Sequence, residues 1–276
     1  MNRARHLLPI CALLALPQFG FAFAKLTPET ARAFDRYVEA AESRMALDLQ
    51  PARFLRMDAA PGLKARVQGG ELVIQPGAIL AGAKDIKVPG GLLQDWLGLM
   101  FIPGANIAGV RAVLQDYPNY KKFYRPEVID SKEISHHDDE YEIFLRLYEK
   151  HILTVVLNAN YQVRYGMLDA KRMYVTSHST RIAEVKDPKR SYTEEEPPGD
   201  DTGFLWRLNS YWRFEEADGG VWAECEAISL SRDVPLGLGF MLKGFLERFP
   251  KESMLNTLRG TKAAVQARDN RPAESR

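Results

Sequence analysis

This chain contains few cysteines and few histidines, and its net charge is close to zero. Its 276 residues include two cysteines and five histidines, and 37 basic side chains balance 36 acidic ones to a formal net charge of +1. A charge this close to zero provides no large positive field for nucleic acid, which is therefore not expected as a partner. So few cysteines exclude a disulfide-rich scaffold. Hydrophobic residues make up 46% of the chain, which is ample for a packed core.

The N-terminus holds an apolar run at residues 7–23. Basic residues precede this run, and Ala22, Phe23 and Ala24 form an A-x-A cleavage signal before Lys25. This order is typical of a secretory signal peptide over residues 1–24. The alternative is an uncleaved anchor, but the run is short for a membrane-spanning helix. We therefore expect a protein exported through a Sec-type signal peptide, periplasmic or secreted, that keeps one cysteine and forms no internal disulfide.

Hydrophobic periodicity predicts helices at both ends of the mature chain and strands between them. Residues 27–49 repeat apolar side chains at helical spacing, and residues 71–76 form a short strand candidate. A strand at 92–102 precedes helices at 105–116 and 119–124, and the chain after Pro235 is helical again. The middle contains strand-like segments at 128–134, 141–150, 152–168, 172–185, 204–216 and 220–230.

This order resembles the helix-grip fold of the START and polyketide-cyclase superfamily. GLMFIPGANIAGVRAVLQDYPNYKKFYRPEV, residues 98–128, is similar to its first strand and two small helices. The closing hairpin and grip helix of that fold are similar to residues 211–235, YWRFEEADGGVWAECEAISLSRDVP, and the helix that follows them. The resemblance, to an exported bacterial member, implies an α+β fold in which a curved antiparallel β-sheet wraps around a long C-terminal α-helix. It divides the mature chain into an N-terminal helical extension at 25–90, a START-like domain at 91–268 and a polar tail at 269–276.

Strand alternation predicts which side chains face the interior. In the closing hairpin, a turn at 218–219 or at 219–220 gives the same two faces. One face carries Trp206, Leu208, Ser210, Trp212 and Phe214 opposite Ala223, Cys225, Ala227 and Ser229. This face is either plain core or the lining of a ligand cavity. The other face places Arg213 near Glu224 and Glu226 and is either a solvated surface or, as the resemblance implies, directed inward with Arg213 and Glu226 orienting a ligand.

The resemblance and the apolar faces together favour a protein that holds a hydrophobic small molecule, such as a lipid or a terpenoid, between the sheet and the C-terminal helix. The alternatives are a cyclase- or hydrolase-like enzyme of the same superfamily and an interaction scaffold without a pocket. We expect a monomer with transient membrane contact. The predicted ligand-binding residues are Leu157, Tyr161, Tyr165, Trp206, Trp212, Phe214, Met241, Phe245, Arg213 and Glu226.

Three other patterns are not expected to carry chemistry. The ligand types in HHDDE, residues 136–140, are consecutive and alternate in direction, which favours a solvated turn over a metal site. His178 has no partner placed by the sequence and is interpreted as a surface or cavity-rim residue. Cys225 lies between two acidic residues and is interpreted as a buried structural thiol. No catalytic residue, metal or cofactor is therefore predicted, and the inward face of residues 172–185 is left unassigned.

Overall fold

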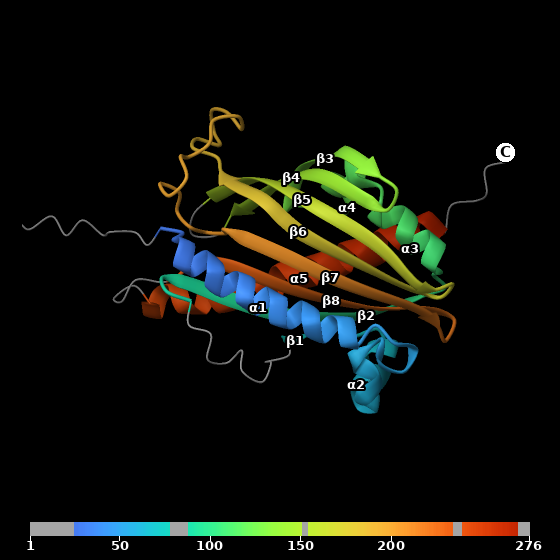
Figure 1. Cartoon of the computed structure of the whole chain (residues 1–276). Helices are drawn as coiled ribbons and strands as arrows, with labels where there is room; N and C mark the ends of the chain where they lie inside the picture. Colours follow the sequence, from blue (N-terminus) through green and yellow to red (C-terminus); the bar gives the residue numbers. More distant parts are fainter. Residues whose placement is uncertain (1–24, 78–87, 151–153, 234–238, 270–276) are drawn as a thin grey trace, which may run out of the picture.

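An antiparallel sheet forms the centre of the molecule and carries helices on both faces (Figure 1). The structure is a computed structural model that describes residues 25–77, 88–150, 154–233 and 239–269, without the side chains of 239–248 and 269. Eight strands pair in the order β1-β2-β8-β7-β6-β5-β4-β3. They are β1 (Val73–Pro76), β2 (Gly91–Pro103), β3 (Val128–His137), β4 (Glu140–Lys150), β5 (Thr154–Asp169), β6 (Arg172–Glu184), β7 (Arg207–Ala217) and β8 (Gly220–Arg232).

The β7–β8 hairpin sets the register at the centre of the sheet. Asp218 and Gly219 both have positive φ, 54° and 75°, which is the conformation of the tight two-residue turn that an Asp-Gly pair favours. Trp212 consequently lies opposite Cys225, and Arg213 lies opposite Glu224. The two faces predicted for this hairpin are therefore confirmed from Leu208 to the turn.

The helices are α1 (Pro28–Leu47), α2 (Pro61–Gln68), α3 (Ile107–Leu114), α4 (Tyr120–Phe123) and α5 (Gly239–Asp269), with short 3-10 turns at η1 (Pro51–Arg53), η2 (Arg56–Ala59) and η4 (Tyr117–Asn119). Helix α1 begins after Thr27, whose side chain accepts a hydrogen bond from the Thr30 N–H. Helix α3 begins after Asn106, whose side chain accepts from the Gly109 N–H at 2.8 Å. Both are N-caps that the sequence supplies locally.

Helix α5 packs on one face of the sheet, which we call the inner face. Met100, Ala159, Phe214 and Leu258 belong to the core cluster on this side. Gly98 in β2 leaves room for Met254 and Leu258 of α5, because a Cβ atom there would lie 2.7 Å from the Met254 sulfur. The long C-terminal helix thus contacts the sheet closely at one edge, as the predicted fold class requires.

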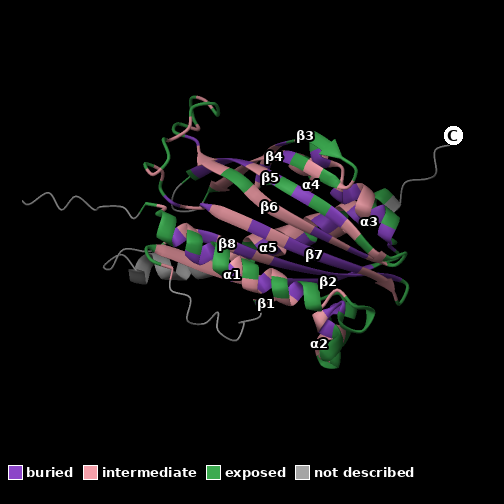
Figure 2. Ribbon diagram, in the orientation of Figure 1, coloured by how far each residue is buried: buried purple, intermediate pink, exposed green. Residues whose placement is uncertain are grey.

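The segment of residues 25–76 covers the opposite, outer face. In Figure 1, α1 runs along β7 and β8 in front of the sheet, while α5 lies behind it. Phe34 and Tyr37 of α1 pack with Ile228 and Leu230, and Trp222 packs beneath the segment that follows α1. Buried residues consequently dominate β8 and occur on both faces of β7 (Figure 2). The N-terminal extension is therefore a third layer of the same body, and β1 extends the sheet itself.

Candidate functional site

A cavity of about 270 Å³ lies between the inner face of the sheet and α5. Strands β4 to β8 supply one wall, residues 114–128 close one side, and the described part of α5 supplies Phe249, Pro250 and Met254. The lining is largely aliphatic and aromatic, which is the composition of sites that bind apolar small molecules. Protein interiors are normally close-packed, so a cavity of this size among the core residues is a distinct feature of the molecule.

The cavity brings together four of the predicted ligand-binding residues. Leu157, Tyr161 and Tyr165 reach it from β5, and Trp212 reaches it from β7. Phe214 is fully buried in the core beside the cavity, and its ring stacks on that of Trp212 with the centroids 5.3 Å apart. Met241 and Phe245 were also predicted, but their side chains lie outside the described residues. In β6, which the sequence left unassigned, Val175 and Ser177 face the cavity.

The prediction for Trp206 is wrong. This residue packs in the outer cluster with Tyr211, Ile228 and Leu230, and its indole N–H donates to Asp201 at 3.1 Å. Strand β7 begins only at Arg207, so the alternation of its side chains does not extend back to Trp206. Trp206 therefore helps to hold α1 on the sheet and does not line the cavity.

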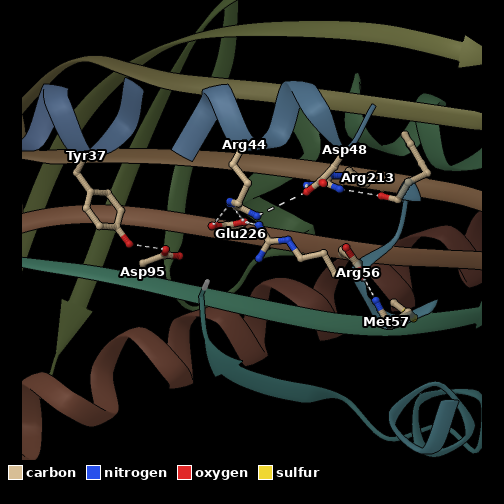
Figure 3. Close-up of polar contacts among 10 residues, drawn as sticks. Tyr37, Arg44, Asp48, Arg56, Met57, Asp95, Arg213 and Glu226 are labelled. Carbon is tan, nitrogen blue, oxygen red and sulfur yellow. Dashed lines mark hydrogen bonds and ion pairs between the residues drawn. The ribbon is translucent and has the colours of Figure 1, made fainter. Parts of the chain in front are cut away.

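The prediction that Arg213 and Glu226 orient a ligand is also wrong, because both lie on the outer face beneath the N-terminal segment (Figure 3). Glu226 accepts two hydrogen bonds from Arg44, at 2.7 and 2.8 Å, and a further one from Arg56. Arg213 donates to the Phe54 carbonyl at 2.8 Å. The alternative of a solvated surface fails as well, since Glu226 is 3% exposed and Arg213 is 6% exposed.

Two more carboxylates complete this buried cluster, and both have raised pKa values. Asp95 accepts from the Tyr37 hydroxyl at 2.7 Å, and its burial with the nearby Glu226 charge raises its pKa to about 7. Glu224 accepts from the Met57 N–H at 2.8 Å, and its burial raises its pKa to about 7. Desolvation disfavours the charged form of each group more than its neighbours favour it. The cluster therefore ties the N-terminal segment to the sheet with groups that titrate near neutral pH.

Tyrosines form one end of the cavity. The hydroxyls of Tyr117 and Tyr165 lie 2.8 Å apart, and Tyr165 and Tyr120 both donate to the Leu114 carbonyl, at 2.8 and 2.5 Å. Tyr124 shares a hydrogen bond with Thr261 of α5 at 3.0 Å. Burial raises the pKa of Tyr124 to about 12 and raises the pKa values of the other three as well. These side chains are therefore neutral hydroxyls that fix the local structure and not phenolate bases.

The acidic residues in the cavity wall are Glu127 and Glu149. Glu127 accepts from Ser253 and Asn256 of α5, at 3.0 and 2.7 Å. Burial, together with the negative charges of Glu127 and Glu252, raises the pKa of Glu149 to about 8. Glu149 is therefore mostly protonated at neutral pH. Among the described lining residues there is no lysine, arginine or histidine.

The three sequence patterns that were not expected to carry chemistry either lie away from the cavity wall or have a side chain that burial keeps protonated. His178 is on the outer side of the sheet, where its Nε2 atom lies 2.7 Å from Glu42 Oε1 of α1, and Tyr211 donates to the same oxygen at 2.8 Å. His137 and Asp138 stand almost fully exposed at the β3–β4 turn. Cys225 does line the cavity, but burial raises the pKa of its thiol.

The described residues contain no group of side chains able to hold a metal ion. None of the described helices is both long and apolar enough to span a membrane.

No protein-family model and no curated protein matches the chain. Among solved structures, it is similar to the Zhui aromatase/cyclase from a Streptomyces species, with 10% identity, a TM-score of 0.47 and coverage of 67% of this chain and 100% of that one. It is similar to a STAR-related lipid transfer protein from Xanthomonas axonopodis, with 15% identity, a TM-score of 0.45 and coverage of 71% and 98%. Human STARD10 gives 12% identity, a TM-score of 0.43 and coverage of 79% and 80%. Likenesses this distant do not decide what the chain binds.

The order and packing of the chain's own elements decide its architecture. Two small helices follow β2, a meander of antiparallel strands returns to pair β8 with β2, and α5 lies across the inner face. The chain has a START-like helix-grip fold. The predicted α+β class, with a curved antiparallel sheet, a long C-terminal helix and N-terminal helices, is therefore confirmed.

Proposed function

We propose that this protein binds a hydrophobic small molecule, of the terpenoid or single-chain lipid kind, in the cavity between the sheet and α5. The observation that supports this proposal is a cavity of about 270 Å³ with a mainly aliphatic and aromatic lining. Burying each methylene group there is worth about 0.8 kcal/mol. Binding sites for drug-sized ligands range from about 300 to 1,000 Å³, so the occupant is one compact molecule. The described wall favours binding, because it is mainly apolar and contains no lysine, arginine or histidine.

Filling the cavity tests this proposal. Ala227 faces the cavity from β8, opposite Ser210 of β7 and Trp96 of β2. A phenylalanine there occupies space that the ligand needs, and we expect Ala227→Phe to weaken binding of 1-aminoanthracene, a neutral fluorescent reporter, by about tenfold or more. The reporter's fluorescence is titrated at neutral pH with the wild type and with the variant.

The matched control is Ala263→Phe, which adds the same side chain at an exposed position of α5. This control should bind the reporter as the wild type does, and both variants should keep the circular dichroism spectrum of the folded protein. Equal reporter binding by the wild type, Ala227→Phe and Ala263→Phe would place the reporter outside the cavity and contradict the proposal.

We also propose that the protein is exported, with cleavage after Ala24. Support comes from the order of basic, apolar and A-x-A residues at 1–24, which lie outside the described residues. Production of the full chain in a Gram-negative host should give a periplasmic species whose intact mass corresponds to a start at Lys25. Ala24→Arg should block this cleavage. A cytoplasmic protein that retains residues 1–24 would contradict the proposal.

A further inference from the structure

Two hydrogen-bond donors in the cavity wall have no partner among the described residues. Tyr161 of β5 is 6% exposed, and its hydroxyl group forms no hydrogen bond with a described residue. Trp212 of β7 is 8% exposed, and its indole N–H also forms no hydrogen bond with a described residue. Buried tyrosine hydroxyls and tryptophan N–H groups usually find a partner, because an unsatisfied buried donor is costly. Both residues line the cavity, so an acceptor that enters it can supply the partner that the described chain does not.

The same side-chain types are satisfied elsewhere. The four other tyrosines in the cavity wall all use their hydroxyls in hydrogen bonds, namely Tyr117, Tyr120, Tyr124 and Tyr165. The other three tryptophan N–H groups donate to Gln94, Asp201 and Asp218, respectively at 3.3, 3.1 and 3.0 Å. Among the tyrosines of the cavity wall and the described tryptophans, the absence of a hydrogen-bond partner is thus particular to Tyr161 and Trp212.

Further polar groups of the wall are neutral. Ser177 and Ser210 face each other directly across β6 and β7, line the cavity and form no hydrogen bond with a described residue through their hydroxyls. A carboxylate or phosphate in the cavity would meet no cationic side chain among the described lining residues. It would instead share the space with the acidic residues Glu127 and Glu149. Burying an unpaired anion is costly, so the described part of the wall disfavours fatty acids and phospholipids.

We propose that the cavity selects an uncharged molecule bearing a hydrogen-bond acceptor, most simply a carbonyl group, which Tyr161 and Trp212 bind. This inference rests on the proposed function and narrows its ligand class. The indole N–H can only donate, so the group that satisfies Trp212 must be an acceptor. Tyr161 can likewise donate to an acceptor on the ligand, and the serine hydroxyls offer additional contacts to a hydroxyl or ether.

Three probes of similar shape separate these chemistries: 2-acetylnaphthalene, which has a carbonyl, 2-isopropylnaphthalene, which has none, and the anion 2-naphthoate. Each displaces 1-aminoanthracene from the full mature protein at neutral pH. We expect the ketone to bind most tightly and the carboxylate at least tenfold more weakly. Tyr161→Phe and Trp212→Phe should each weaken ketone binding about three- to tenfold, the range of one net hydrogen bond, and leave the hydrocarbon within twofold of the wild type.

Tyr124→Phe is the matched control, because Tyr124 also lines the cavity but shares its hydroxyl with Thr261. It should not change the preference for the ketone over the hydrocarbon. If the reporter and all three probes fail to bind, the proposed function itself is wrong. If the probes bind but the ketone has no advantage, or Tyr161→Phe and Trp212→Phe leave that advantage unchanged, the protein binds hydrophobic molecules and the inferred acceptor site is wrong.

Discussion

Replacing Glu226 with alanine should lower the free energy of unfolding by about 3–5 kcal/mol, the usual result of removing one partner from a buried ion pair. Glu226 is 3% exposed and accepts hydrogen bonds from both Arg44 and Arg56 (Figure 3). Its removal leaves Arg56 without its counter-charge and leaves Arg44 with only the longer contact to Asp48, at 3.8 Å. Urea denaturation at pH 7 measures the loss, and limited proteolysis should show earlier cleavage within residues 25–76.

The matched control is Glu140→Ala. Glu140 pairs with Arg164 at 2.6 Å, but both side chains are more than half exposed. Ion pairs on the surface contribute at most about 1 kcal/mol, so this variant should unfold close to the wild type. If Glu226→Ala and Glu140→Ala unfold at the same urea concentration, the buried cluster does not hold the N-terminal segment on the sheet.

The residues on the inner face of the sheet could be predicted from the sequence, because the signals that place them lie within single strands and the turn between two of them. Alternation with a period of two separates the two sides of β5, and the Asp218–Gly219 turn fixes which residues of β7 and β8 lie opposite each other. Trp212 opposite Cys225 follows from these two signals alone. The same two signals predict that Tyr161 and Trp212 face the cavity. They do not predict that the hydroxyl of Tyr161 and the indole N–H of Trp212 lack a hydrogen-bond partner, because hydrogen bonding depends on the packed structure.

The outer face could not be predicted, because the partners of its charges come from far along the chain. Arg44 and Arg56 are 182 and 170 residues from Glu226. From strand alternation alone, a charged row covered by a distant segment looks the same as a row exposed to water. One signal was present: Trp222 and Ile228 share that face with the charged residues, and large apolar side chains there call for a cover. The apolar stripe of α1 supplies it.

The error at Trp206 and the strand left unassigned, β6, both have local causes. Trp206 precedes the first paired residue of β7, so extending the alternation to it placed its ring on the wrong face. The pattern in β6 is mixed because its register against β5 shifts between Ser179 and Arg181. Val175 before this shift and Ile182 after it both pack in the inner cluster, although they are an odd number of residues apart. An irregularity of this kind breaks the period of two along the strand.

The free energy of unfolding should fall as the pH rises from about 5 to about 8. The folded protein holds the pKa of Glu224 at about 7, above its ordinary value of 4.5, and raises that of Asp95 from 3.8 to about 7. Between those limits the folded state binds more protons than the unfolded state, so each rise in pH favours unfolding. At about 1.4 kcal/mol per pKa unit, Glu224 alone gives a loss on the order of 3 kcal/mol. Glu149 adds to the loss with the same sign.

Neutral isosteres of these acids give the sharpest test. Gln at 224 can still accept from the Met57 N–H, and Asn at 95 can still accept from the Tyr37 hydroxyl. Because each variant resembles the protonated side chain, Glu224→Gln and Asp95→Asn should match the wild type near pH 5 and exceed its stability near pH 8. Urea denaturation across this range measures both slopes. Variants that lose stability equally at both pH values would show that these carboxylates are charged in the folded protein at pH 5, and that the buried cluster is an array of fixed ion pairs with no protons to lose.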